Sequence, residues 1–110
     1  MKKSHINFTV DLDDKNVPEK ITWSASDKPD SKMEETKSMS ISLWDHTQKN
    51  TMRIDLWSKD MPVDEMKTFI LQTFLSMKQS ISKATSEENL VNLIEDFCIE
   101  FEKRISNKSK

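Results

Sequence analysis

One stretch of the sequence decides the fold, namely residues 51–66, which read TMRIDLWSKDMPVDEM. In its first half Met52, Ile54 and Leu56 alternate with other side chains, and this period of two is typical of a strand with one apolar face. After Pro62 the apolar side chains recur every three or four residues, which is the period of an amphipathic helix. The stretch therefore predicts a strand that is followed by a helix.

The same alternation occurs three times upstream, around Ile6–Leu12, Ile21–Ala25 and Met39–Leu43. The last of these strands could extend back over Met33–Lys37, or that stretch could be a loop. Because the connections are short, consecutive strands should pair antiparallel. We predict a four-stranded antiparallel meander over about residues 4–57, with one apolar face that needs a cover.

Polar residues fill the expected connections. A turn over Asp13–Asn16 needs a left-handed residue, and Asn16 is the best candidate because the chain contains no glycine. Ser26–Lys32 is a loop by composition, and Asp45–Asn50 joins the third and fourth strands.

The second half predicts two helices, at about residues 61–82 and 86–105, and a frayed polar tail over residues 106–110. Asp60 is the expected N-cap of the first helix, and Thr85 that of the second.

Docking the helices on one face of the sheet would bury the apolar side of both layers. We therefore expect an α+β fold in a single domain over residues 1–110, with the two C-terminal helices packed on the sheet.

Composition excludes several classes of function. Lys and Arg number 17 against 19 Asp and Glu, and this balance argues against nucleic-acid binding. The absence of glycine excludes a Gly-rich phosphate loop and a dinucleotide-binding fingerprint. The single cysteine, Cys98, lies in an apolar helical stretch and is expected to be buried. We expect a soluble, cytoplasmic protein without direct membrane insertion, catalytic residues, cofactor or metal site.

The candidate site depends on two tryptophans in the outward register. Trp44 lies on the side opposite the apolar face of its strand, and so does Trp57, which shares its side with Arg53 and Asp55. If the two strands pair, the indoles could be neighbours on the open face of the sheet, where exposed aromatic side chains are commonly interaction anchors. Alternatively, strand twist or the strand ends tuck one or both indoles into the rim of the core. The predicted protein-interaction residues are Trp44, His46, Arg53, Asp55 and Trp57.

Several blocks of the sequence carry a family resemblance. They are Trp44-Asp45-His46, Thr51–Trp57 and Lys59–Met66 in the centre, Phe8–Asp13 and Val17–Trp23 at the start, and Asp96-Phe97-Cys98 near the end. Together these blocks resemble the gliding motility protein GldC family. The resemblance implies a small soluble protein of gliding Bacteroidetes with an accessory role in surface motility, whose machinery is tied to protein secretion. It implies no catalytic activity and no cofactor.

The functional prediction is a non-enzymatic protein-interaction module that serves the gliding and secretion apparatus, with proteins of that machinery as partners. The alternative is a small holdase-like chaperone for motility or secretion clients, and an enzyme is the third reading. Pairing of an edge strand with a second copy, which would give a homodimer, is left open.

Overall fold

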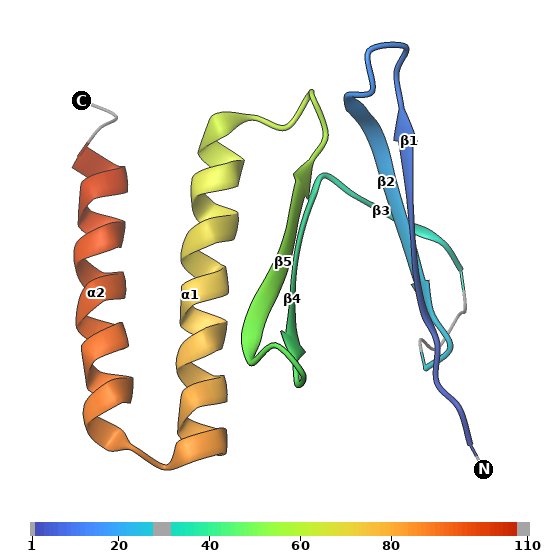
Figure 1. Cartoon of the computed structure of the whole chain (residues 1–110). Coiled ribbons are helices and arrows are strands. Elements are labelled where there is room, and N and C mark those ends of the chain that lie inside the picture. Colours follow the sequence, from blue (N-terminus) through green and yellow to red (C-terminus); the bar gives the residue numbers. More distant parts are fainter. Residues whose placement is uncertain (1, 28–31, 108–110) are drawn as a thin grey trace. The chain divides into compact units, whose positions relative to one another are not determined.

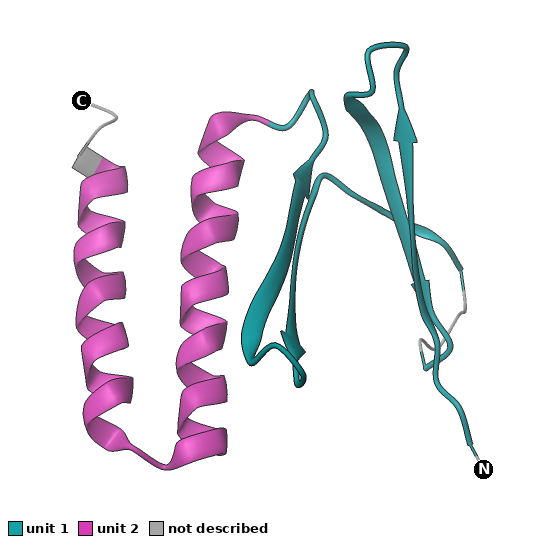
Figure 2. Ribbon diagram, viewed as in Figure 1, with its two compact units in different colours: residues 1–61 teal, residues 62–110 magenta. Residues whose placement is uncertain are grey.

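The computed structural model describes residues 2–27 and 32–107, and its elements follow in the order β1-β2-β3-β4-β5-α1-α2 (Figure 1). The chain forms two compact units, residues 1–61 with the strands and residues 62–110 with the helices (Figure 2). Strands followed by two C-terminal helices confirm the predicted α+β class. That the chain is a single domain with its helices packed on a sheet stays a prediction.

The first three strands form one antiparallel sheet in the order β1-β2-β3, with bounds Ile6–Leu12, Pro18–Ala25 and Glu34–Thr36. Phe8 lies opposite Trp23 in the register of β1 and β2, as their alternation predicts. The central strand, β2, has a neighbour on each side and carries Ile21, which is fully buried.

Asp13 and Asn16 shape the turn between β1 and β2. The Asp13 carboxylate accepts hydrogen bonds from the backbone N–H groups of Lys15 (2.8 Å) and Val17 (2.9 Å). Asn16 has a φ of 63°, so the prediction of a left-handed residue at this position is confirmed.

The remaining two strands, β4 (Ser38–Asp45) and β5 (Asn50–Trp57), form a separate two-stranded antiparallel sheet. The prediction of one four-stranded meander is therefore wrong. The stretch before β4, which the alternation left open as strand or loop, contains the short strand β3 and belongs to the first sheet.

Hydrogen bonds mark the junction between β3 and β4. The Thr36 hydroxyl donates to the carbonyl of Ser38 at 2.9 Å, which ties the backbone on either side of Lys37 together. The Lys37 carbonyl in turn accepts the N–H of Ser58 at 2.8 Å, just beyond the end of β5. Lys37 and Ser58 are the next pair in the register of β4 and β5, so from Lys37 onward the chain pairs with β5 and no longer with β2.

The helices α1 (Val63–Thr85) and α2 (Glu88–Asn107) lie side by side and pack through aromatic rings. Phe74 of α1 meets Phe97 and Phe101 of α2 edge-on, with ring centroids 5.1 and 5.7 Å apart. Leu71 and Cys98 are buried within this pair, and burial of the thiol confirms the expectation for Cys98.

The expected helix caps are wrong. α1 begins after Pro62, which occupies the N-cap position and has no side-chain oxygen with which to cap the helix. Thr85 belongs to the last turn of α1, where its hydroxyl donates to the carbonyl of Ile81, and Ser86 then ends the helix in the left-handed conformation. Asp60 lies two residues before the N-cap, and its carboxylate accepts hydrogen bonds from Ser58 at 2.7 Å and Lys37 at 3.0 Å instead.

Parts of two predicted segments lie outside the described residues, namely residues 28–31 of the Ser26–Lys32 loop and residues 108–110 of the tail. The first two residues of the predicted tail, 106 and 107, belong to α2.

Candidate functional site

The candidate site is the side of the β4–β5 hairpin that carries both outward tryptophans, which we call the tryptophan face. Its members alternate with the apolar side chains of the hairpin and are Ser38, Ser40, Ser42, Trp44, Thr51, Arg53, Asp55 and Trp57. Trp44 is 62% exposed and Trp57 is 54% exposed. The hairpin thus presents two large aromatic side chains on one surface.

The register of the hairpin separates the two indoles. Trp44 lies opposite Thr51, near the turn, whereas Trp57 lies opposite Ser38, at the other end of the ladder. The two positions are six residue steps apart along the strand, which corresponds to about 20 Å. The expectation that the indoles are neighbours within one chain is therefore wrong, although they do share a face.

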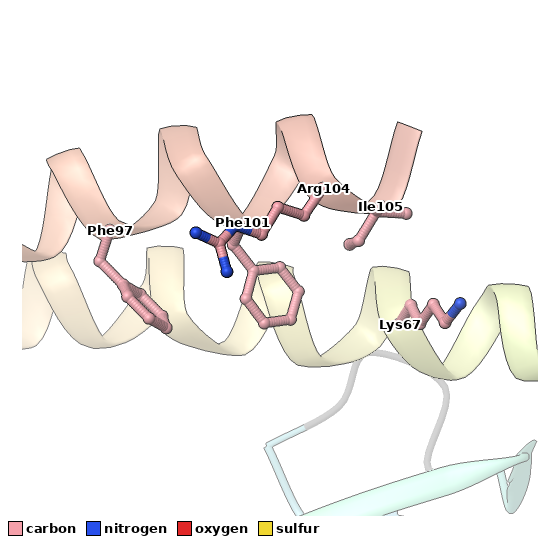
Figure 3. Close-up of a pocket in the computed structure, with 5 residues that line it drawn as sticks. All are labelled: Lys67, Phe97, Phe101, Arg104 and Ile105. Atoms are coloured by element: carbon pink, nitrogen blue, oxygen red, sulfur yellow. The ribbon is translucent and has the colours of Figure 1, made fainter. Parts of the chain in front are cut away.

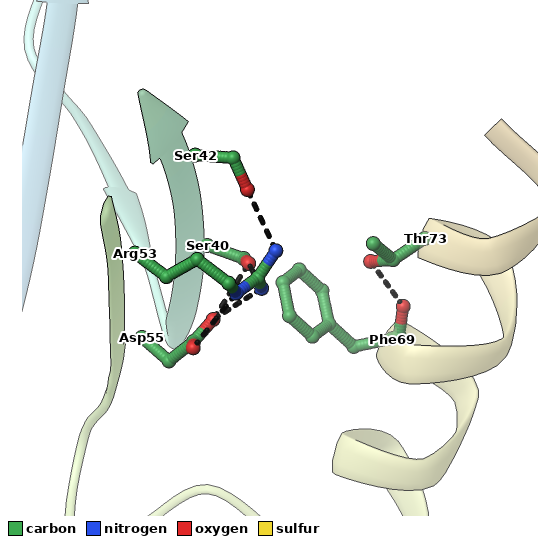
Figure 4. Close-up of polar contacts among 6 residues, drawn as sticks. All are labelled: Ser40, Ser42, Arg53, Asp55, Phe69 and Thr73. Atoms are coloured by element: carbon green, nitrogen blue, oxygen red, sulfur yellow. Dashed lines mark hydrogen bonds and ion pairs between the residues drawn. The ribbon is translucent and has the colours of Figure 1, made fainter. Parts of the chain in front are cut away.

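In the register of the hairpin, Arg53 and Asp55 lie between the tryptophan positions. They form a hydrogen-bonded network with Ser40 and Ser42, which Figure 4 shows. The guanidinium donates to the hydroxyl of Ser42 at 2.6 Å, to the hydroxyl of Ser40, and to the carboxylate of Asp55 at 2.9 Å. Ser40 also donates to Asp55 at 2.6 Å. Four side chains therefore hold each other in one arrangement, and the planar guanidinium has little freedom left.

The register explains the network, because Ser40 lies opposite Asp55 and Ser42 lies opposite Arg53. The hydrogen bond from Ser40 and that from Arg53 hold the pKa of Asp55 below its ordinary value. The carboxylate stays ionised at neutral pH, so the face carries an adjacent positive and negative charge.

His46 lies in the turn after β4 and is exposed. The Asp45 carboxylate shapes this turn by accepting the N–H groups of Thr47 (2.9 Å) and Gln48 (3.1 Å). Of the five predicted site residues, the structure therefore brings Arg53 and Asp55 into contact. Trp44 and His46 lie toward the turn end of the hairpin, and Trp57 lies at the opposite end.

Ser40 and Ser42 are not among the residues that the sequence predicts for the site. Their alternation with apolar residues placed them correctly on the face of Arg53 and Asp55. The pairing register, which sets them directly opposite those charged residues, is the signal that could have identified them.

Two lysines anchor the end of the hairpin where it leaves the first sheet. Lys37 pairs with Glu35 (3.3 Å) and Asp60 (3.0 Å), and the hydrogen bond with Asp60 is the largest cause of its raised pKa. Lys59 pairs with Asp13 at 3.0 Å and with Glu19 at 3.2 Å. The N–H of Lys59 also donates to the carbonyl of Pro18, so this end of the hairpin is fastened to β2.

The helix pair carries a separate feature, an open groove of about 500 Å³. Its lining residues are Lys67, Phe97, Phe101, Arg104 and Ile105. In Figure 3 both phenyl rings point from α2 toward α1. The groove thus combines an apolar floor with two cationic side chains, of which Arg104 is paired with Glu100 at 3.0 Å.

No helix in the described part of the chain has a stretch that is long and apolar enough to cross a membrane. A comparison with protein families found that residues 18–107 match the family described as gliding motility-associated protein GldC-like. The match covers the second strand, the hairpin and both helices. Neither a curated protein nor a solved structure matches the chain.

Proposed function

Because the chain belongs to the GldC-like family of gliding motility-associated proteins, we propose that it is a non-enzymatic accessory protein of gliding motility that acts by binding another protein. Its partner would be a component of the gliding or secretion apparatus. We place it in the cytoplasm, because the chain has one cysteine and therefore no intrachain disulfide, as is usual for cytoplasmic proteins.

The observation that carries the proposal is the exposure of two indoles on a surface whose polar centre is already ordered. Burying an exposed aromatic side chain in an interface contributes on the order of 2 kcal/mol. Since Arg53 is held by Ser40, Ser42 and Asp55 in the free protein, less side-chain entropy is lost when a partner binds over it. Trp44 and Trp57 would act as anchors, while Arg53 and Asp55 would select a partner with complementary polar groups.

A double substitution, Trp44→Ala with Trp57→Ala, tests this proposal. The tagged protein is recovered from its native host, and the proteins captured with the wild type are identified and quantified by mass spectrometry. We expect the double variant to capture at least tenfold less of its specific partner than the wild type does. We also expect it to fail to restore surface spreading in a strain that lacks the protein.

The matched control is Met52→Ala with Ile54→Ala. These side chains are 59% and 47% exposed and lie two residues apart in β5, on the other face of the same hairpin. Circular dichroism would verify that both double variants keep their secondary structure. Undiminished partner capture and spreading by the tryptophan variant, or equal losses in both variants, would reject the tryptophan face as the binding site.

The groove on the helix pair favours the alternative function, a holdase-like chaperone for motility or secretion clients. An open apolar surface with phenyl side chains and flanking cations suits unfolded segments of varied sequence better than one defined partner. Light scattering of an aggregating model client, with the protein at stoichiometric amounts, separates the two functions. Suppression that is lost in Phe97→Ser but kept in the tryptophan variant would support the chaperone, and no suppression would reject it.

A further inference from the structure

One side of β4 is open. Among residues 2–27 and 32–107, β4 forms a ladder with β5 only, so every second residue directs its N–H and C=O away from that partner. The outward groups of Ser38 bond to the hydroxyl of Thr36, and those of Ser40 and Ser42 are the next along this edge. Natural edge strands are usually protected by charges, prolines or bulges. The stretch Ser38–Trp44, SMSISLW, contains no charged residue and no proline, and its pairing with β5 is regular. This edge is therefore suited to accept another strand.

The sequence of this edge is complementary to itself. In an antiparallel arrangement centred on Ile41, Met39 lies opposite Leu43 of a second copy, and Ile41 lies opposite its own equivalent. On the other face, Ser40 lies opposite Ser42 of the second copy. Over Met39–Leu43, apolar side chains thus meet apolar ones and hydroxyls meet hydroxyls.

The residues that flank the strand agree with the same register. It sets Lys37, immediately before β4, level with Asp45 of the second copy, so opposite charges meet at both ends of the seam. A shift by two residues in either direction would lose this pairing and would place an apolar side chain opposite a charged one.

We propose that two copies of the chain pair antiparallel through β4, about a two-fold axis at Ile41. The product is a four-stranded sheet in the order β5-β4-β4-β5. An isolated two-stranded hairpin is only marginally stable in water, whereas a sheet of more strands with one apolar face can be covered as a unit. Leu43, Met52 and Ile54, which are 57%, 59% and 47% exposed, belong to that apolar face.

The dimer completes the tryptophan site. In the proposed register Trp44 lies opposite Ser38 of the second copy, and Ser38 lies opposite Trp57 within its own chain. Trp44 and Trp57 of the second copy then share one row across the sheet, separated by a single serine. Two strand spacings amount to about 9.6 Å, compared with the separation of about 20 Å within one chain. Each dimer would carry two such indole pairs, related by the two-fold axis.

Charge exchange at the axis tests the pairing. Ile41→Lys and Ile41→Glu each place like charges opposite each other, so we expect each variant alone to sediment as a monomer in analytical ultracentrifugation, and their equimolar mixture to sediment as a dimer. The control is Ile54→Lys, which carries the same change opposite Ile41 in β5, one strand away from the seam. It is expected to remain dimeric.

A cysteine variant keeps the test decisive if the charged variants fail to fold. Residues directly opposite each other in an antiparallel pair have Cα atoms about 4.5–5.5 Å apart, a distance that a disulfide can span. Oxidised Ile41→Cys should therefore run as a covalent dimer, whereas Ile54→Cys, three strand spacings from its equivalent, should not. The buried Cys98 of the wild type gives the background.

A monomeric wild type at every concentration, or a dimer that Ile41→Cys does not crosslink more than Ile54→Cys, would overturn the proposal. The role of the paired indoles rests on the proposed function. The pairing of two copies is measured on the purified protein without a partner. If the copies do not pair, partner capture by the tryptophan variant still tests the proposed function on its own.

Discussion

At the scale of single residues, Asp13 links the first turn to the end of the hairpin. Its carboxylate accepts two backbone N–H groups of the turn and pairs with Lys59 at 3.0 Å, and its side chain is only 15% exposed. The backbone hydrogen bond from Val17 is the largest cause that holds the pKa of Asp13 below its ordinary value, followed by the hydrogen bond from Lys59.

This lowered pKa predicts how stability depends on pH. The unfolded chain has the ordinary carboxyl pKa of about 3.9, so the contribution of Asp13 to stability is fully present above that pH and is lost as the pH falls through the lower, folded value. We expect Asp13→Asn, which loses the pairing with Lys59, to reduce the free energy of unfolding at pH 7. The deficit relative to the wild type should shrink below about pH 4.

Urea denaturation at a series of pH values measures both effects. Asp14→Asn is the matched control, since the Asp14 side chain makes no hydrogen bond or ion pair with any of the described residues. A deficit for Asp13→Asn that stays constant down to pH 2 would show that the charge of the carboxylate contributes nothing.

The absence of glycine has a cost at three other residues. Asn16, Lys49 and Ser86 have φ values of 63°, 57° and 58°, in the left-handed region that disfavours residues with a Cβ. Asparagine tolerates this region best of the three, because its short polar side chain can bond locally.

Ser86→Gly should therefore stabilise the protein, by about 1 kcal/mol, because glycine is the preferred residue where a helix ends in this conformation. The N–H of Ser86 donates to the carbonyl of Ser82, and glycine keeps that bond. Lys83→Gly, inside the last turn of α1, is the opposite control and should cost about 1 kcal/mol. Thermal unfolding monitored by circular dichroism would record both changes, and a lower midpoint for Ser86→Gly would contradict the argument.

At the scale of elements, periodicity predicted what the local pattern controls. The change of period within residues 51–66 marks the change from β5 to α1, and the alternation placed Trp44 and Trp57 on the same face as Arg53 and Asp55. These features depend only on which side of a strand or helix a residue occupies.

The missing part of the prediction depends on pairing partners. At the boundary between the two sheets, Thr36 and Lys37 make hydrogen bonds, and the bond of Lys37 reaches Ser58, which is far away in the sequence. The separation of the tryptophans follows from the register of β4 and β5, which alternation alone does not define. Ser58 is only 1% exposed and donates to Asp60 at 2.7 Å. Because serine is polar, hydropathy alone does not predict that it is buried.

The helix pair makes a prediction of its own at this scale. Leu71 is the buried leucine of α1, with 9% exposure, so Leu71→Ala leaves a cavity beside α2. We expect a loss of about 2–4 kcal/mol in the free energy of unfolding. Met77→Ala, on the same helix but at a side chain that is 51% exposed, should cost less than about 1 kcal/mol. Similar costs for the two variants would mean that the helices do not pack through Leu71.

At the scale of the whole molecule, the tryptophan face and the open edge of β4 belong to one hairpin, so binding and self-association are coupled. If the indole pairs form only in the dimer, a partner that buries them stabilises the dimer, and the dimer in turn presents a ready site. The same strand then provides both the seam and one anchor of each pair. Loss of self-association in Ile41→Lys should therefore weaken partner capture as well, even though both tryptophans remain in place.

Self-association also predicts that the midpoint of thermal unfolding rises with protein concentration. For a dimer that dissociates as it unfolds, each tenfold increase in protein concentration adds about 1.4 kcal/mol to the apparent stability. For two chains of this length that should raise the unfolding midpoint by roughly 3–5 °C. We expect this dependence for the wild type and for Ile54→Lys, and none for Ile41→Lys, in scanning calorimetry over a hundredfold range of concentration.

A wild-type midpoint that does not change over this range would mean that the chain unfolds as a monomer. The single-residue predictions for Asp13, Ser86 and Leu71 would still stand, because each rests on contacts within one chain.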